Sequence, residues 1–389
     1  MDVLYEYMHN QLARVPSGFA RYQYERINWS GRMLALVGPR GVGKTTLFLQ
    51  RINRAHGDGS ALYVSADHLY FALHSLYEVA DAFYKNNGKF LFIDEVHKYE
   101  NWGRELKNIY DAFPDMHIYF TGSSVLEIEK GESDLSRRAP RYLMQGLSFR
   151  EFLQIRHGIE APVCSFEEIL ANRACIPGIE HPLPLFREYL RNGYYPFGAD
   201  PEFDIELRQV VTRTLEMDIP QFAGMNMATG RKLLKLMAVV SELVPFKPVM
   251  SDLGKRIQAS RNNVEDYLLY MEKAGMIAQL RTGASGIGAL GKVEKLYLDN
   301  TNLLYNLAGD IVDIGTVRET FFLNAMRVNE AVTQGALADF SIRDAVFEVG
   351  GKGKTAAQLE GVENGYVVKD DIEQGYAHVI PLWAFGLNY

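Results

Sequence analysis

The 389-residue sequence has only two cysteines, Cys164 and Cys175, too few for a disulfide framework or a cysteine-based zinc site. No apolar run reaches the ~20 residues of a membrane span, and the start of the chain lacks the basic segment and apolar core of a signal peptide. A net charge of −7 gives no general attraction to nucleic acid. We therefore expect a globular, cytoplasmic protein of about two to four domains, with reduced cysteines and no membrane contact.

The most informative stretch is Gly38-Pro-Arg-Gly-Val-Gly43-Lys44-Thr45, which lies between a short apolar run and a helical pattern. This G-x-x-x-x-G-K-[ST] spacing between strand and helix is typical of a phosphate-binding loop. Glycines let successive N–H groups point at phosphate oxygens, and the helix N-terminus adds a partial positive charge. A glycine turn before a helix would not need Lys-Thr at this place. The predicted nucleotide-binding residues are Gly38, Pro39, Arg40, Gly41, Val42, Gly43, Lys44, Thr45 and Thr46.

Within this loop, Lys44 is predicted to reach the β- and γ-phosphates of ATP, and the Thr45 hydroxyl to ligate Mg²⁺. Two carboxylates follow the continuous apolar run of residues 90–93, which predicts a strand buried on both faces of a parallel sheet. Asp94 is the expected second Mg²⁺ ligand, directly or through water. Glu95 is expected to polarise the water that attacks the γ-phosphate. An Asp-Glu pair at a strand end is common by itself, but the upstream phosphate-binding loop favours catalysis.

A further strand is predicted at residues 117–121, and hydroxyl side chains follow its end. In P-loop ATPases a polar residue at this place contacts the γ-phosphate or orients the water. Thr121, Ser123 and Ser124 are the candidates, and we favour Ser123. The alternative is that Ser123 or Ser124 caps the next helix.

Three arginines, Arg137, Arg138 and Arg141, lie within five residues and lead into a predicted fifth strand. Such a cluster suits an arginine finger that acts on the nucleotide of a neighbouring subunit, with Arg137 and Arg138 as our candidates. This interpretation implies a homo-oligomer. A solvated basic turn explains the arginines equally well.

Together these motifs resemble the prokaryotic ATPases of the extended AAA+ type that join a P-loop domain to a winged helix and a C-terminal domain of unknown function. The resemblance rests on four motifs and two later segments: Gly38–Thr45, Phe92–Lys98, Phe120–Ser124, Leu147–Phe152, Gly193–Phe197 and Glu216–Pro220. It spans nearly the whole chain, and the first 150 residues carry most of its specificity. It implies an α/β fold whose parallel sheet has the strand order 5-1-4-3-2.

The expected domain organisation has five parts. They are an N-terminal lead (1–30), the P-loop ATPase domain (31–150), a helical lid and linker (151–227), a winged helix (228–300) and a small α/β C-terminal domain (301–389). Residues 228–300 hold eleven Lys and Arg against seven Asp and Glu, so they are basic within an acidic chain.

Three helices and a hairpin at 277–281 and 293–298 predict the winged helix. Double-stranded DNA is its candidate partner. The residues expected to contact phosphates are Arg261, Arg281, Lys292 and Lys295. Glu265 and Asp266 would repel phosphate, so a structural or protein-binding wing stays open.

The C-terminal residues place Glu319 on a helix and Asp339 and Glu348 on successive strands, as in the restriction-endonuclease-like fold. Such nucleases need Glu-x-Lys, but position 350 is Gly and the nearest lysine is Lys352. We therefore expect a degenerate domain without nuclease activity.

The resulting hypothesis is a Mg²⁺-dependent ATPase acting as a nucleotide-dependent switch, on DNA or on a partner protein. Three alternatives stay open. A DExH-type helicase fits Asp94-Glu-Val-His97, but the sequence shows no second RecA-like domain. A kinase would need an acceptor pocket and no winged helix, and a nucleotide-gated binding module would show negligible turnover.

Overall fold

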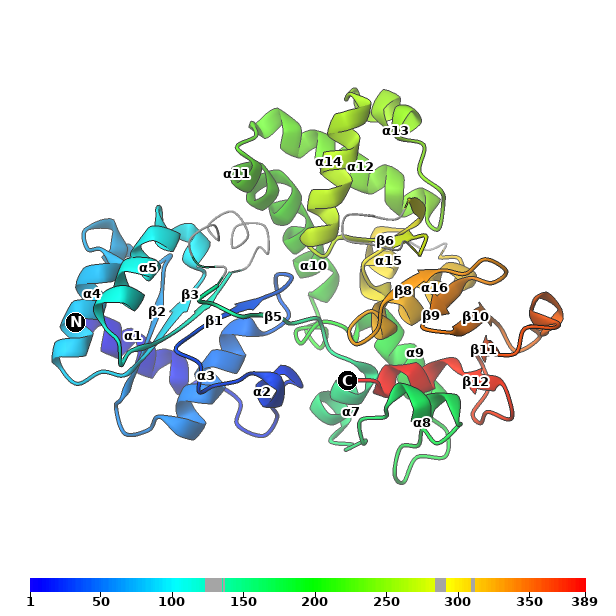
Figure 1. The fold of residues 1–389 in the computed structure, drawn as a ribbon, viewed down its shortest axis with the longest axis horizontal. Coiled ribbons are helices and arrows are strands. Elements are labelled where there is room, and N and C mark those ends of the chain that lie inside the picture. Colours follow the sequence, from blue (N-terminus) through cyan, green and yellow to red (C-terminus); the bar gives the residue numbers. More distant parts are fainter. Residues whose placement is uncertain (123–134, 136, 284–291, 309–311) are drawn as a thin grey trace. The chain divides into compact units, whose positions relative to one another are not determined.

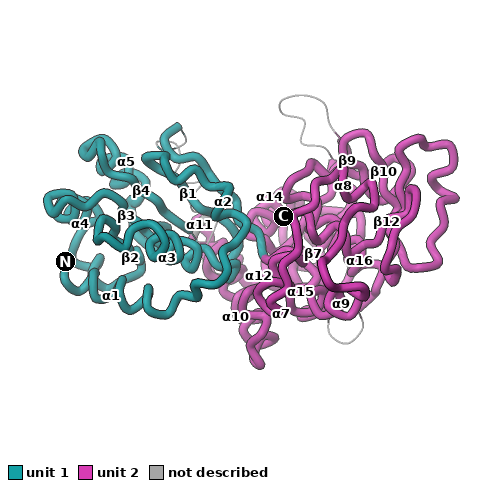
Figure 2. The backbone as a smooth tube through the Cα atoms, turned by 90° about the horizontal axis from the view of Figure 1, so that it is seen from below, with its two compact units in different colours: residues 1–146 teal, residues 147–389 magenta. Residues whose placement is uncertain are grey.

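The computed structural model describes residues 1–389 except 123–134, 136, 284–291 and 309–311. The chain forms two compact units, Met1–Gly146 and Leu147–Tyr389, which Figure 2 colours separately. None of the helices formed by the described residues combines the length and apolar character that a membrane crossing requires.

Unit 1 is built on a sheet of five parallel strands. They are β1 (Met33–Val37), β2 (Ala61–Ser65), β3 (Phe90–Asp94), β4 (His117–Thr121) and β5 (Arg141–Leu143). Their order across the sheet is β2-β3-β4-β1-β5, and all four neighbouring pairs are parallel. Read from the other edge, this is the predicted order 5-1-4-3-2, so the α/β fold with a P-loop ATPase sheet is confirmed.

Helices cover both faces of this sheet (Figure 1). They are α1 (Asp2–Leu12), α2 (Gln23–Arg26), α3 (Lys44–Ala55), α4 (Leu76–Lys85) and α5 (Trp102–Ala112), with short 3₁₀ turns η1 (Leu69–Ala72) and η2 (Val96–Lys98). The chain leaves β1 for the distant edge strand β2 and then returns through β3 to β4. Because crossovers are right-handed, this reversal places α4 and α5 on the face opposite α3. α1 packs against α3, and α4 packs against α5.

Unit 2 begins with helices that lead into a three-helix group and a hairpin. The first elements are α7 (Phe149–His157), α8 (Phe166–Leu170), α9 (Leu183–Asn192), α10 (Phe203–Arg213), the π-helix η4 (Thr214–Asp218) and α11 (Ile219–Ala223). Next come α12 (Met227–Leu243), α13 (Met250–Ile257), α14 (Arg261–Lys273), β6 (Ile277–Arg281) and β7 (Val293–Leu298). β6 and β7 pair antiparallel and have the predicted bounds. That these elements form a winged helix stays a prediction.

The remainder of unit 2 is a helix pair and a mixed sheet. The elements are α15 (Thr301–Leu307), α16 (Ile314–Met326), β8 (Val332–Gln334), β9 (Phe340–Ile342), β10 (Ala345–Gly350), η5 (Ala357–Leu359), β11 (Gly365–Lys369), β12 (Val379–Pro381) and η6 (Leu382–Leu387). The strand order is β12-β11-β10-β9-β8, and α16 packs on β10. Pairing is parallel from β10 to β12 and antiparallel from β8 to β10.

The start of α7 is joined to the C-terminal end of the chain. Ser148 and Glu151 form a capping box, and the Ser148 hydroxyl donates to the main-chain oxygen of Tyr389 at 2.6 Å. The Arg150 Nε donates to the same oxygen at 3.0 Å. The first helix of unit 2 therefore contacts the last residue of the same unit. The domain boundaries predicted within unit 2 stay predictions.

Candidate active site

The phosphate-binding loop connects β1 to α3. Gly38, Gly41 and Gly43 all have positive φ angles, of 152°, 84° and 97°. A Cβ at position 38 would lie 2.2 Å from the main-chain oxygen of Met144, so the loop passes too close to the residue after β5 for any other side chain. α3 begins at Lys44, directly after Gly43, and its N-terminal N–H groups therefore adjoin the curled loop.

The Lys44 ammonium is buried within this loop. Its Nζ donates to the main-chain oxygens of Gly38 and Pro39, both at 2.8 Å. The lysine therefore lies across the loop, and its charge adjoins two of the loop's carbonyl oxygens.

Asp94 accepts hydrogen bonds from three hydroxyl groups at the end of β3. Thr45 donates to its Oδ2 at 2.7 Å, and Tyr63 of β2 donates to the same oxygen at 2.9 Å. Thr121, the last residue of β4, donates to Oδ1. Burial, and next the charge of Asp94, raises the pKa of Tyr63, so its phenol stays a proton donor. The carboxylate is thus linked directly to the phosphate-binding loop.

Glu95 has the left-handed backbone conformation, with φ 52°. Its main-chain N–H donates to the Thr121 hydroxyl at 3.1 Å, and its side-chain Oε1 lies 3.9 Å from Nη1 of Arg40 in the phosphate-binding loop. Burial raises the pKa of Glu95, while the nearby Arg40 charge opposes that rise. The Glu95 carboxylate, whose pKa is raised, therefore lies beside the loop. A raised pKa makes a carboxylate a better proton acceptor.

Two contributors to this site were missed by sequence reasoning. Arg21 is buried, and its guanidinium donates to the main-chain oxygens of Val42, Gln145 and Gly146, the last two at 2.7 Å. It joins the phosphate-binding loop to the chain after β5. Tyr63 is the other. Neither lies in a motif, and no sequence signal connects them to residues so distant in the chain.

Family models match two parts of the chain, an AAA domain at residues 30–153 and a domain of unknown function at residues 183–311. The first match covers all five strands of the sheet and the loop just described. Residues 30–153 form an AAA-type ATPase domain. No curated protein matches the chain.

Among solved structures, a Walker-type ATPase of Pyrococcus abyssi is 15% identical with a TM-score of 0.45, over 76% of this chain and 99% of that chain. PCH-2 of C. elegans is also 15% identical, with a TM-score of 0.24, over 69% of this chain and 68% of that chain.

The AAA domain contains the remaining predicted catalytic residues. Ser123 and Ser124 lie outside the described residues. Arg137 is exposed, and Arg138 lies 3.5 Å from Asp111 through its Nη2 and 5.7 Å from the ring centre of Tyr110. The roles of Ser123 and the two arginines stay predictions. Thr121, the third hydroxyl candidate, donates a hydrogen bond to Asp94.

The predicted DNA-contacting residues differ in their surroundings. The Arg261 Nε lies 3.0 Å from Glu265, and Arg281 donates to both carboxylate oxygens of Glu272 at 2.7 and 3.1 Å. Lys292 is exposed. A groove of about 670 Å³ is lined in part by Arg261, Arg281 and Lys292, together with Glu265 and Asp266.

Lys295 lies in a partly buried cluster with two carboxylates. Its Nζ is 3.1 Å from Glu319 and 3.3 Å from Asp339. The Tyr297 phenol also donates to Glu319, at 2.6 Å. Burial, and next the charge of Asp339, raises the pKa of Glu319. Lys295 thus supplies the positive charge between two carboxylates that the sequence had assigned to a nuclease-like site.

Glu348, the third of these carboxylates, is buried and pairs with Lys354. Lys352, the nearest lysine in the sequence, is exposed and is not that partner. A Cβ at Gly350 would lie 2.8–2.9 Å from Lys354 side-chain carbons, so Lys354 occupies the space that a side chain at position 350 would fill. Among the described residues, no group of three or more His, Cys, Asp or Glu is arranged to hold a metal ion.

Proposed function

We propose that this chain binds ATP with Mg²⁺ and hydrolyses it, and that the nucleotide state controls action on a partner. The observation that carries the proposal is the 2.7 Å hydrogen bond between Thr45 of the phosphate-binding loop and Asp94, with Glu95 next in the chain. This bond links the two motifs that nucleotide hydrolysis needs. The AAA-type match over residues 30–153 supports it.

In this proposal the loop residues 38–46 bind the phosphates through their N–H groups. Lys44 exchanges its two main-chain acceptors, the oxygens of Gly38 and Pro39, for β- and γ-phosphate oxygens. That exchange replaces neutral acceptors with charged ones, which strengthens the hydrogen bonds of the ammonium.

The residues present fit Mg²⁺, which prefers oxygen ligands and is bound by one or two protein groups plus phosphate. Thr45 Oγ1 and Asp94 Oδ2 are such oxygens and already lie within hydrogen-bonding distance. The metal would neutralise charge on the phosphates. Tyr63 and Thr121 would orient Asp94 for that purpose.

Glu95 is the proposed general base. It would accept a proton from water as the water oxygen bonds to the γ-phosphorus and the bond to the ADP oxygen breaks. Ser123 is proposed to orient the water or the γ-phosphate. Arg137 and Arg138 are proposed to act on the nucleotide of a neighbouring subunit in a homo-oligomer.

Double-stranded DNA is the proposed partner, through a winged helix at residues 228–300. Exposed ion pairs such as Arg261–Glu265 are worth only about 0–1 kcal/mol, so phosphate could displace Glu265. Lys295 would have to leave two partly buried carboxylates, which costs more. Arg281 would likewise have to leave the partly buried Glu272, to which it donates two hydrogen bonds. Arg261 and Lys292 would then supply about two contacts and a slope of log K against log salt near −1.8.

A protein partner is the second candidate. Glu265 and Asp266 line the same groove as Arg261 and Arg281, and the mixed charges resemble a polar protein interface more than a phosphate track.

ATP turnover and binding of a fluorescent ATP analogue test the proposal. Lys44→Ala should abolish both, whereas Lys85→Ala, which alters an exposed lysine paired with Asp81, should leave both unchanged. If Lys44→Ala binds the analogue with an affinity within a few-fold of the wild-type protein, Lys44 does not bind the phosphates.

Fluorescence anisotropy with a random-sequence duplex, at two salt concentrations and with and without ATP, separates the two partners. Salt-sensitive binding supports DNA. No binding at low salt in either nucleotide state would leave the protein partner.

A further inference from the structure

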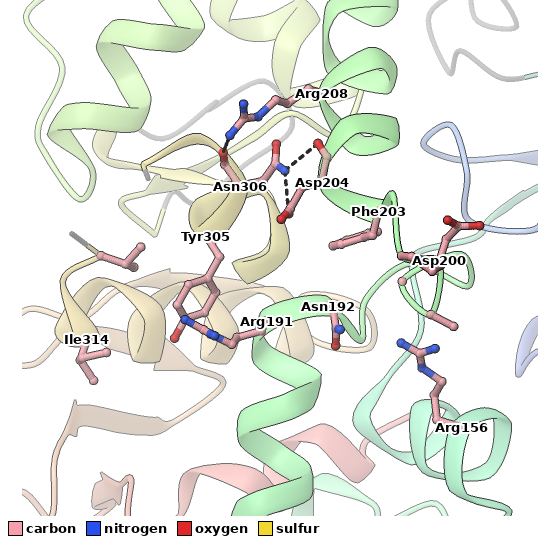
Figure 3. A pocket seen from close by; sticks show the side chains of 14 residues that line it. Arg156, Arg191, Asn192, Asp200, Phe203, Asp204, Arg208, Tyr305, Asn306 and Ile314 are labelled. Carbon is pink, nitrogen blue, oxygen red and sulfur yellow. Dashed lines mark hydrogen bonds between the residues drawn. The ribbon is translucent and has the colours of Figure 1, made fainter. Parts of the chain in front are cut away.

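Unit 2 contains a cavity of about 710 Å³ that lies outside the AAA domain (Figure 3). Its walls come from the ends of α7 and α9, the loop before α10, α10 itself, α15 and the start of α16. Most of the lining falls within residues 183–311, which match the domain of unknown function. The volume is in the range of cavities that hold small organic ligands, roughly 300–1,000 Å³.

Three guanidinium groups from three different helices line this cavity: Arg156 of α7, Arg191 of α9 and Arg208 of α10. Among the residues that the structure describes, no carboxylate lies within ion-pairing distance of any of the three. Arg187, one turn earlier on α9, instead pairs with Asp371 at 2.8 Å. Within the described part of the chain, the three cavity arginines therefore keep donors that an anionic ligand can use.

Arg191 and Arg208 are exposed, and each contacts one neighbour that leaves most of its donors available. The Arg191 guanidinium lies over the Tyr305 ring, 5.4 Å from its centre (Figure 3). Arg208 makes one long hydrogen bond, of 3.4 Å, to the main-chain oxygen of Asn306. A guanidinium carries five N–H donors in a planar fork that matches phosphate oxygens.

The cavity also has two aspartates, and both accept hydrogen bonds from neighbouring groups. Asp204 accepts from the side-chain amide of the buried Asn306 at 3.0 Å, and Asp200 accepts from the main-chain N–H of Glu202 at 2.9 Å. The lining thus carries three positive charges and two negative ones, and both carboxylates accept hydrogen bonds from nearby groups. Burial raises the pKa of Tyr305, so its phenol stays a donor.

We propose that this cavity is a binding site for a phosphoryl compound, with Arg191, Arg208 and Arg156 as its candidate anion ligands. Charge-assisted bidentate hydrogen bonds from guanidinium groups supply the affinity. Tyr305 and Phe203 offer aromatic surface to an organic part of the ligand. The site is separate from the phosphate-binding loop and does not depend on ATP hydrolysis.

Isothermal titration calorimetry of the full chain tests this proposal, with Lys44→Ala as the host so that the phosphate-binding loop does not take the probe. The probes are inorganic pyrophosphate, ribose 5-phosphate and AMP, titrated separately. We expect at least one to bind. Preference for AMP over ribose 5-phosphate indicates a nucleotide, equal binding of the two indicates a sugar phosphate, and binding of pyrophosphate alone indicates an inorganic ligand.

Arg191→Gln and Arg208→Gln, each added to the host, should weaken binding by about tenfold or more. Arg213→Gln is the matched control, because Arg213 ends the same helix as Arg208 but does not line the cavity. Circular dichroism and thermal unfolding check that each variant folds. The proposal is overturned if no probe binds the host at low millimolar concentration, or if both arginine variants bind as well as the host does.

Discussion

The hydroxyl of Thr121, at the end of β4, donates a hydrogen bond to Asp94, at the end of the neighbouring strand β3. The same hydroxyl oxygen accepts from the main-chain N–H of Glu95 at 3.1 Å. One threonine therefore contacts both members of the acidic pair. Because Asp94 is buried, the donors around it determine which way its oxygens face.

Thr121→Val should impair this arrangement while preserving the shape of the side chain. The change leaves the Glu95 N–H without its acceptor and removes one of three hydroxyl donors to Asp94. We expect a loss of about 1–3 kcal/mol in the free energy of unfolding and a lower kcat, with ATP binding changed less. Chemical denaturation and steady-state turnover measure these effects. Thr121→Ser is the control and should retain both, and equal losses in the two variants would contradict the hydrogen-bond explanation.

Arg40 should influence the pH below which ATP turnover falls, because its charge lowers the pKa of Glu95. Burial already raises the pKa of Glu95, and the Arg40 charge opposes that rise. Without this charge the carboxylate protonates at a higher pH, and a protonated base cannot accept the proton of water. In Arg40→Ala, the acid limb of kcat at saturating ATP should therefore move to higher pH. Arg40→Lys keeps the charge and should resemble the wild-type protein. If the acid limb of kcat does not move in Arg40→Ala, the Arg40 charge does not influence the pKa of Glu95.

Lys295 should matter for stability more than any exposed lysine of the hairpin. Lys295→Ala leaves Glu319 and Asp339 close together without their shared cation, and we expect a cost of roughly 1–3 kcal/mol because the cluster is partly exposed. Protonation of Glu319, whose pKa is already raised, relieves the repulsion. The loss should therefore be larger at pH 8 than at pH 5.

Denaturation of Lys295→Ala at the two pH values, with Lys292→Ala as the exposed control, measures this effect. A loss as small as that of the control at both pH values would show that the ion pairs contribute nothing.

The sequence was sufficient for those features that depend on short spacing. The glycine-rich turn between β1 and α3 and the place of Asp94 at the end of β3 followed from local patterns, because strand, loop and helix are adjacent in the chain. The sheet order followed from the family resemblance. Arg21 could not be found this way, since its acceptors include Gln145 and Gly146, more than 120 residues away.

The ion-pair partners of Lys295 and Lys354 could not be predicted from the sequence either. Lys295 appeared as a phosphate-contacting residue because it follows a basic hairpin pattern, but folding brings it to Glu319 and Asp339. Lys354 rather than Lys352 reaches Glu348, because the turn after β10 folds its side chain back over Gly350. Sequence distance does not predict such contacts when a turn intervenes.

ATP turnover by Glu95→Gln, measured beside binding of a fluorescent ATP analogue, tests the central claim most directly. The amide keeps the shape of the side chain but loses the charge that accepts a proton. We predict analogue binding within a few-fold of the wild-type protein and turnover lowered by about 100-fold or more. Turnover at the wild-type rate in Glu95→Gln would contradict the account, because Glu95 would then have no part in hydrolysis.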